Sequence, residues 1–168
     1  RLEAAAGLVK SGDVLCDVGS DHAYLPLMLI KNGVIERAVA CDVNAGPLER
    51  GRQHAAKQGV SSIEFVLSDG LGSVETPFDV AAICGMGGEL IIRIIREGGE
   101  KGKKRLILQP MTGIEKVRAF LWQSGFAITD EVFPVEDGKA YCVIGAEFSG
   151  AVPDFSYADT YLGKIRPG

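Results

Sequence analysis

Four segments of the sequence combine aspartate, serine and glycine in patterns that suit the binding of a small polar ligand. The richest segment begins at Asp17 and ends at Tyr24, and it carries two carboxylates, a histidine, a tyrosine and one glycine. The other segments are centred on Asp42, on Asp69 and on the glycine-rich run 85–88. Glycine admits a ligand close to the backbone, and carboxylates accept hydrogen bonds from hydroxyl groups and attract cations. These segments therefore predict a ligand that carries hydroxyl groups and positive charge.

The first segment distinguishes between two kinds of nucleotide cofactor. A dinucleotide-binding loop uses the pattern GxGxxG, whose glycines bring a pyrophosphate against a helix N-terminus. Residues 17–22 read Asp-Val-Gly-Ser-Asp-His, with one glycine and with carboxylates where a phosphate would be repelled. S-adenosylmethionine has an ammonium group, a sulfonium centre and no phosphate. The segment therefore favours S-adenosylmethionine over NAD, and the sequence contains no Walker-type phosphate loop.

We predict that all four segments hold this cofactor. Asp42 is placed to accept hydrogen bonds from the ribose hydroxyls, and Asp69 with Gly70 to fix the adenine amino group. Taken singly, each aspartate also fits a helix cap or a turn. The predicted cofactor-binding residues are Asp17, Gly19, Ser20, Asp21, His22, Asp42, Val43, Ser68, Asp69, Gly70, Gly85, Met86 and Gly87.

The four segments follow short apolar runs that alternate with helical patterns. This alternation is typical of βαβ units on a parallel sheet, which binds ligands beyond the carboxyl ends of its strands. Near the end of the chain, two strand-like runs flank Asp137-Gly138, which predicts an antiparallel hairpin. The predicted strands are 14–18, 37–43, 63–67, 78–84, 106–108, 126–135 and 139–148, and the predicted helices are 2–9, 26–32, 47–58, 89–97 and 114–124.

These elements define the expected fold class. It is α/β, with a Rossmann-like seven-stranded sheet that is mostly parallel, ends in a C-terminal antiparallel hairpin and has helices on both faces. The length of 168 residues fits one domain, which we expect to span residues 1–150. Residues 151–168, with two prolines, are predicted to be a linker or a surface excursion.

The composition excludes several classes of protein. With 46% hydrophobic and 24% charged residues, the chain is expected to bury a substantial core. No apolar run approaches the ~20 residues of a membrane span, and no secretory signal is visible, so we expect a cytoplasmic protein with no membrane contact. The cysteines stand singly in apolar runs and only two histidines occur, so we expect buried thiols and no metal site. The four cysteines are Cys16, Cys41, Cys84 and Cys142.

The net charge of −4 offers no general attraction to nucleic acid, so such a partner would need a local basic patch. One basic cluster lies between the fourth and fifth predicted strands, where a solvated loop is the favoured alternative. Its members are Arg93, Arg96, Lys101, Lys103, Lys104 and Arg105.

At the four segments the sequence resembles the bacterial tRNA adenine-N1 methyltransferases that act at adenine 22 of the D-arm. The resemblance extends in order and spacing from Arg1 to about Glu147. It rests on VLCDVGSDHAYLP (14–26), CDVNAGPL (41–48), SDGL (68–71), GMGG (85–88) and LQP (108–110).

The resemblance implies a class I methyltransferase that uses S-adenosylmethionine and has tRNA as its partner. That family continues into a helical C-terminal domain, so residues 151–168 are expected to lead toward such a domain, which is missing from this chain. The sequence does not determine the oligomeric state, for which a monomer is the default expectation.

The predicted catalytic residues are Asp21, His22 and Tyr24. Asp21 would stabilise the positive charge that adenine acquires on methylation, and Tyr24 would stack on the base. His22 would accept a proton or orient a reactant; a hydrogen bond within the loop is the favoured alternative for His22, and packing against the following helix is the alternative for Tyr24.

Four further residues carry weaker expectations. Gln109 and Pro110 are expected to line the substrate side or simply to end a strand, with the second interpretation favoured. We expect His54 to be exposed and Trp122 to lie in the core.

Residues 85–88 lack the Asn/Asp-Pro-Pro-Tyr/Phe motif of enzymes that methylate exocyclic amines. This is compatible with a ring nitrogen, which has an in-plane lone pair. Three alternatives stay open: a methyltransferase with another substrate, a catalytically silent cofactor-binding scaffold, and an NAD-dependent oxidoreductase.

Overall fold

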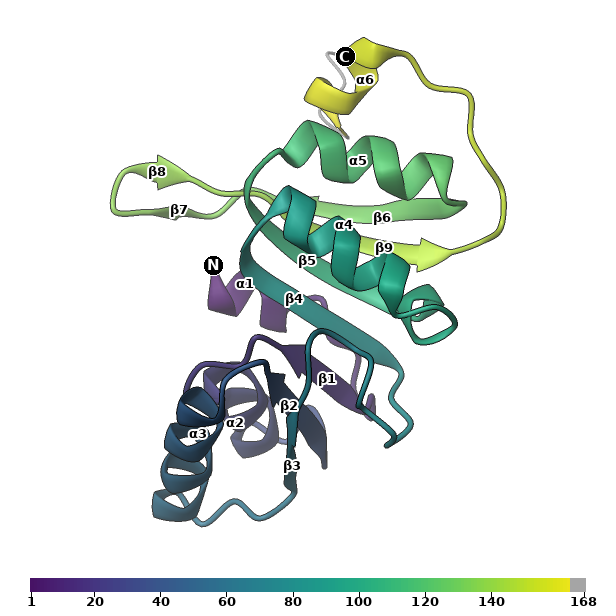
Figure 1. The fold of residues 1–168 in the computed structure, drawn as a ribbon. Helices are drawn as coiled ribbons and strands as arrows, with labels where there is room; N and C mark the ends of the chain where they lie inside the picture. The colour runs from purple at the N-terminus through teal and green to yellow at the C-terminus, as the bar shows by residue number, and fades with distance from the viewer. Residues whose placement is uncertain (164–168) are drawn as a thin grey trace.

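A computed structural model describes residues 1–163 of the chain and shows one central sheet of seven strands (Figure 1). The strand order is β3-β2-β1-β4-β5-β9-β6. The first five strands run parallel, whereas β9 is antiparallel to both of its neighbours. The strands are β1 (Leu15–Val18), β2 (Ala38–Asp42), β3 (Ile63–Leu67), β4 (Val80–Gly87), β5 (Arg105–Thr112), β6 (Phe126–Val132) and β9 (Val143–Phe148). The predicted fold class is confirmed.

The strand order reverses between β1 and β4. From β1 the chain moves outward through β2 to β3, and then returns to add β4 on the other side of β1. The connections that follow β1 and β4 therefore leave toward opposite faces of the sheet, which opens a crevice at the carboxyl ends of these two strands.

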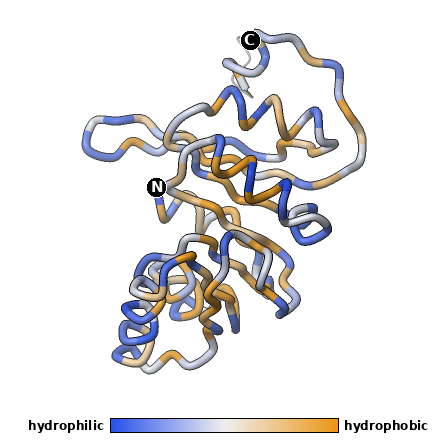
Figure 2. Tube along the Cα trace, viewed as in Figure 1, coloured by the Kyte–Doolittle hydropathy of each residue, from blue (hydrophilic) through white to orange (hydrophobic). Residues whose placement is uncertain are grey.

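Helices cover both faces of the sheet (Figure 1). In the central strands, consecutive side chains point to opposite faces. Leu15 packs with Leu25 and Leu29 on one face, whereas Cys16 packs with Ile91 on the other. Figure 2 shows hydrophobic residues concentrated in these strands and polar residues along much of α3. The first face carries α1 (Leu2–Ala6), α2 (Tyr24–Lys31) and α3 (Ala45–Lys57), and the second carries α4 (Gly88–Glu97) and α5 (Ile114–Gln123).

Strands β4 and β5 are longer than predicted. The sequence suggested ends near Cys84 and Leu108, but pairing continues to Gly87 and Thr112. Pro110 therefore does not end its strand, and the prediction that it does was wrong. Proline has no N–H to donate, and the register of β4 against β5 shifts at this point, on either side of Met86.

Two helices on the first face differ from the prediction at their ends. The first helix ends at Ala6, three residues early, and continues only as turns. The second begins at Tyr24 and not near Pro26, because Ala23 adopts a left-handed conformation that sets the helix start. Tyr24 thus stands at the first position of α2, where its side chain is half exposed.

The predicted C-terminal hairpin is present, with an insertion. β6 and β9 pair directly, and their connection forms a smaller hairpin of β7 (Val135–Glu136) and β8 (Lys139–Ala140) that projects from the body (Figure 1). Asp137 and Gly138 both have positive φ, as a two-residue hairpin turn requires.

Residues after 150 pack partly on the domain. Helix α6 (Tyr157–Leu162) begins with a capping box at Ser156. Earlier in the chain, a short 3-10 helix, η1 (Lys101–Lys103), follows α4. Helix α6 lies against α5, and residues 164–168 of the expected linker lie outside the described residues. Trp122, predicted to be core, is partly buried and contacts Phe155 with ring centroids 5.0 Å apart. None of the helices within residues 1–163 is long and apolar enough to cross a membrane.

Arg118 joins three elements through buried polar contacts. Its Nε lies 2.7 Å from Glu131 of β6, and both side chains are buried. Its terminal nitrogen donates to the carbonyls of Thr160 and Tyr161 at 2.8 and 2.9 Å. A buried arginine thus pairs with a carboxylate and also caps the carbonyl end of α6.

Replacing Arg118 by alanine should lower the free energy of unfolding by about 3–5 kcal/mol, because it removes the cation that compensates the charge of the buried Glu131 carboxylate. Lys116→Ala, on the same helix as Arg118, is the matched control: it breaks an exposed pair with Glu89 of α4, so a loss of roughly 0–1 kcal/mol is expected. Urea denaturation of both variants measures the difference. Equal losses would contradict the structural role of Arg118.

Candidate active site

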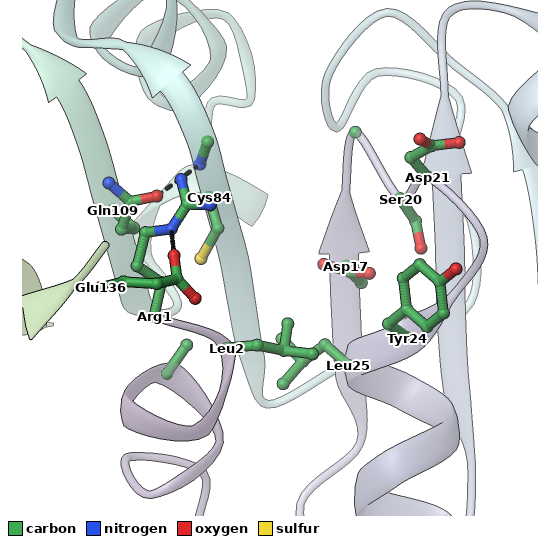
Figure 3. Close-up of a pocket in the computed structure, with 13 residues that line it drawn as sticks. Arg1, Leu2, Asp17, Ser20, Asp21, Tyr24, Leu25, Cys84, Gln109 and Glu136 are labelled. Atoms are coloured by element: carbon green, nitrogen blue, oxygen red, sulfur yellow. Dashed lines mark hydrogen bonds and ion pairs between the residues drawn. The ribbon is translucent and has the colours of Figure 1, made fainter. Parts of the chain in front are cut away.

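A cavity of about 260 Å³ opens where the strand order reverses. Asp17, Cys84 and Gln109 point into it from the ends of three adjacent strands, since alternation puts them all on the face covered by α1 and α2. Figure 3 shows Arg1, Cys84, Gln109 and Glu136 on one wall, and Asp17, Ser20, Asp21 and Tyr24 on the other. The lining residues are Arg1, Leu2, Ala5, Asp17, Gly19, Ser20, Asp21, Tyr24, Leu25, Cys84, Gly85, Gln109 and Glu136.

Asp17 is a buried carboxyl group with no cation beside it among residues 1–163. Its side chain is largely removed from water, and burial raises the pKa of Asp17 to about 6. A weak interaction with Ser20 lowers this pKa in part, without reaching good hydrogen-bond geometry. Ser20 Oγ is itself buried and has no partner among the described residues. This wall of the cavity therefore offers one carboxylate and one hydroxyl to a ligand that donates hydrogen bonds.

Gly19 brings the backbone to the edge of the cavity. Its φ of 73° is in the left-handed region, which favours glycine. A Cβ atom at this position would lie 2.2 Å from the terminal methyl of Met86. The N–H groups of Gly19 and Ser20 both donate to the Cys41 carbonyl of β2, at 2.8 and 3.0 Å. The start of the loop is thus fixed to the neighbouring strand.

The predicted catalytic residues lie together at the mouth of the cavity. Arg50 of α3 donates to Asp21 at 3.1 Å, and His22 Nε2 lies 3.5 Å from the same carboxylate oxygen. The His22 and Tyr24 rings stack with centroids 5.4 Å apart. Asp21 and Tyr24 line the cavity and are exposed, so both can meet a ligand that enters from outside.

Asp42 lies at the same edge, at the end of β2 and outside the cavity lining. Its Oδ1 accepts the N–H of Asn44 at 2.7 Å, which is a turn contact, and its carbonyl accepts the N–H of Ser68 at 2.9 Å. Ser68 Oγ accepts the N–H of Ser73, and Val43 is exposed. The second oxygen of Asp42 makes no hydrogen bond to the described residues, so the ribose role stays a prediction.

Asp69 is paired with an arginine. Arg93 of α4 donates to both carboxylate oxygens, at 2.8 and 3.1 Å, and this hydrogen-bonded guanidinium lowers the pKa of Asp69. Gly70 packs closely against Ile94: a Cβ added at Gly70 would lie 3.1 Å from the Ile94 side chain. The adenine contact predicted for Asp69 and Gly70 stays a prediction, and the ligand would share Asp69 with Arg93.

The glycine-rich run is held by Gln109. Its Oε1 accepts the N–H of Gly85 at 3.1 Å, and its amide donates to the Pro110 carbonyl. Gly85 lines the cavity, whereas Met86 and Gly87 lie beyond it in the irregular end of β4. Gln109 lines the cavity and lies inside β5, so the prediction that it ends the strand was wrong.

Sequence reasoning missed several cavity residues. Cys84 directly precedes the predicted Gly85, and alternation along its strand could have indicated it; burial raises the pKa of its thiol to about 12. Arg1 and Glu136 form an ion pair across the cavity wall, between the chain start and the β7–β8 hairpin. No sequence pattern connects residues so far apart.

Half of the basic cluster between β4 and β5 is neutralised by carboxylates. Arg93 pairs with Asp69 and Glu97, Lys103 with Glu100, and Arg105 with Asp13. Lys101 donates to carbonyls of the segment before β4, and Arg96 lies over the Phe120 ring. These contacts favour the solvated-loop interpretation over a patch for nucleic acid.

The fold and the site define the class of protein. A Rossmann-like sheet whose last strands are antiparallel, with carboxylates and glycines at the carboxyl edge, is the architecture of the S-adenosylmethionine-dependent methyltransferases. The chain belongs to the family described as "Methyltransferase domain", whose model matches residues 1–144.

Individual relatives agree with this assignment and confirm the resemblance stated above. The chain is 39% identical over 151 residues to the tRNA (adenine(22)-N(1))-methyltransferase of Bacillus subtilis, covering 88% of this chain and 63% of that protein. The crystal structure of Streptococcus pneumoniae Sp1610 in complex with S-adenosyl-L-methionine superposes with a TM-score of 0.90 at 37% identity, over 98% of this chain and 78% of the other. M. capricolum TrmK with bound S-adenosyl-homocysteine gives 0.86 at 28%, over 96% and 73%.

The raised pKa of Asp17 predicts a stability that depends on pH. The folded state favours the protonated form, so Asp17 stabilises the fold below its unfolded pKa of 3.8, and this contribution is lost as the pH rises through about 6. Asp17→Asn cannot ionise and should be more stable than the parent above about pH 7, by up to about 3 kcal/mol. Unfolding free energies measured from pH 4 to pH 8 test this; a difference that stays constant over the range would contradict it.

Proposed function

We propose that this domain transfers a methyl group from S-adenosylmethionine to N1 of an adenine in tRNA, at position 22 of the D-arm, in the cytoplasm. The observation that carries the proposal is the buried Asp17 carboxyl, which faces the cavity at the β1–β4 crevice and has no cation beside it in the described part of the chain. The name of the B. subtilis relative supports the reaction, and the chain spans 63% of that protein's length.

The residues at the carboxyl edge fit the cofactor. The ammonium group of S-adenosylmethionine would supply the positive charge and donors that Asp17 and Ser20 Oγ lack. Gly19 admits the ligand to the backbone, while Asp42 and Asp69 continue along the edge toward β2 and β3, where ribose and adenine would lie. When bound, the cofactor supplies an electrophilic methyl group on a sulfonium centre.

The mouth of the cavity suits a flat, aromatic substrate. Tyr24 and His22 form a stacked pair beside the entrance, and Tyr24 is half exposed. A base that leaves its stack in the RNA could lie against this pair, as enzymes that modify bases require. Position would then provide much of the catalysis, since near-attack geometry can contribute roughly 7–11 kcal/mol.

The charges at the mouth suit a product that is cationic. Adenine N1 has an in-plane lone pair and needs no base to remove a proton before it reacts, and the methylated ring carries positive charge. Asp21 stands at the entrance, where its carboxylate would stabilise that charge, and its pairing with Arg50 orients the side chain. The run 85–88 offers backbone groups and no side-chain acceptor, as a ring-nitrogen target permits.

Labelled S-adenosylmethionine and unmodified bacterial tRNA test the proposal. We expect 1-methyladenosine by nucleoside mass spectrometry, and its loss when the D-arm adenine is replaced. Cofactor binding without product would contradict the substrate assignment and favour a scaffold or another substrate. No cofactor binding, with NADH bound instead, would contradict the reaction class.

Asp42→Ala should weaken S-adenosylmethionine binding by about 10- to 100-fold, the range that hydrogen bonds to one charged group provide. Isothermal titration calorimetry measures it. Asp154→Ala is a matched control, because this exposed aspartate lies in the segment before α6, remote from β2 (Figure 1). Unchanged affinity in Asp42→Ala would remove the ribose from this position.

A further inference from the structure

One face of α3 carries side chains that contact the predicted catalytic loop or support such a contact. Arg50, His54 and Gln58 recur every four residues from the middle of this helix to its C-cap, so their side chains lie along one stripe. Arg50 binds Asp21, His54 contacts the backbone of His22, and Gln58 contacts His54. The loop is thus held by a helix from elsewhere in the sequence.

The loop needs such support because its backbone is strained. His22 and Ala23 have φ values of 61° and 54°, in the left-handed region that residues with a Cβ rarely adopt. Such a conformation is unfavourable and persists only when its surroundings hold it. Ala23 is fully buried and lies beside Gly51 of α3, where a Cβ would be in ordinary contact with that of Ala23, at 3.5 Å, and too close to the Phe65 ring, at 2.7 Å.

A chain of three hydrogen bonds fixes which nitrogen of His54 carries the proton. Lys31 has only donors, so the Gln58 atom 2.8 Å from its ammonium is the amide oxygen. The Gln58 amide nitrogen therefore faces His54 Nε2 at 2.7 Å and donates to it. With Nε2 as acceptor, the proton of the ring is on Nδ1, which donates to the His22 carbonyl at 2.9 Å.

The two halves of the loop have different anchors. The Cys41 carbonyl of β2 holds the N–H groups of Gly19 and Ser20, which face the cofactor side. His54 holds the carbonyl of His22, and its ring also meets the edge of Tyr24 with centroids 5.1 Å apart. Loss of the His54 contact should therefore disturb His22 and Tyr24 while the cofactor side stays in place.

We propose that His54 is a positioning residue: through Nδ1–H it holds the strained turn at His22–Ala23 and so orients His22 and Tyr24 toward the substrate. The catalytic part of this inference rests on the proposed function. His54 was expected from the sequence to be an exposed residue; it is half buried and tied to the loop.

Two substitutions separate positioning from stability. Leucine at position 54 has a high helix propensity but no hydrogen-bond donor. Asparagine has a lower helix propensity but places an amide N–H near the position of the His54 Nδ1. We expect His54→Leu to lower kcat for tRNA methylation by about 10- to 100-fold and His54→Asn to stay within about three-fold of the parent, with the S-adenosylmethionine Kd changed less than about three-fold in both. Gln53 is an exposed residue of the same helix that donates a hydrogen bond to Glu49, and Gln53→Leu should leave kcat unchanged.

The order of the kcat values of the two His54 variants decides between a positioning role and a purely structural one. If kcat follows thermal stability, with Asn worse than Leu, or if both retain the parent value, the proposal is overturned.

A readout without turnover keeps the positioning role of His54 distinct from the proposed function. Nitrogen-15 NMR of the imidazole at neutral pH should show His54 protonated at Nδ1 and not at Nε2, and Gln58→Leu should alter the Nε2 signal. A parent protein that shows this pattern but methylates no tRNA would sink the proposed function alone; a proton on Nε2 would sink the positioning role.

Discussion

The reversal of strand order between β1 and β4 is the constraint on which the site depends. Because the chain leaves these neighbouring strands toward opposite faces, no crossover covers their carboxyl ends, and a cavity forms there. Asp17 lies one residue before the end of β1, and Cys84 and Gly85 lie in the second half of β4, so residues 67 or more positions apart in sequence come to share one cavity.

The carboxylates along this edge differ in how their charge is compensated, and this difference organises the site. Asp69 is paired with Arg93 and Asp21 with Arg50, whereas Asp17 is buried, has no cation beside it among the described residues and has a pKa raised to about 6. A buried carboxylate without a counter-charge is unfavourable in the free protein, and a cationic ligand would relieve that cost.

The loop after β1 combines a rigid half with a strained half. Gly19 takes a positive φ without penalty, but His22 and Ala23 do so at a cost that packing must offset. The supports come from α3, where Gly51 lies beside the buried Ala23 and His54 binds the His22 carbonyl. Strain of this kind is typical of functional loops, since it holds side chains in orientations that a relaxed backbone would not maintain.

The sequence by itself determined the strand–helix alternation, the fold class and the residues that end the strands, because periodicity and glycine signals are local. It located Asp17, Gly19, Ser20, Asp21, Tyr24 and Gly85 in what proved to be one cavity. It misjudged β5, because the missing N–H of Pro110 is accommodated by a register shift in β4, which only the paired strands reveal. Only the tertiary structure decided that Arg1 and Glu136 form one wall of the cavity, that Arg93 pairs with Asp69, and that His54 supports the loop after β1. These contacts join residues far apart in the chain, and their partners are set by how helices and hairpins pack on the sheet, which no local pattern encodes.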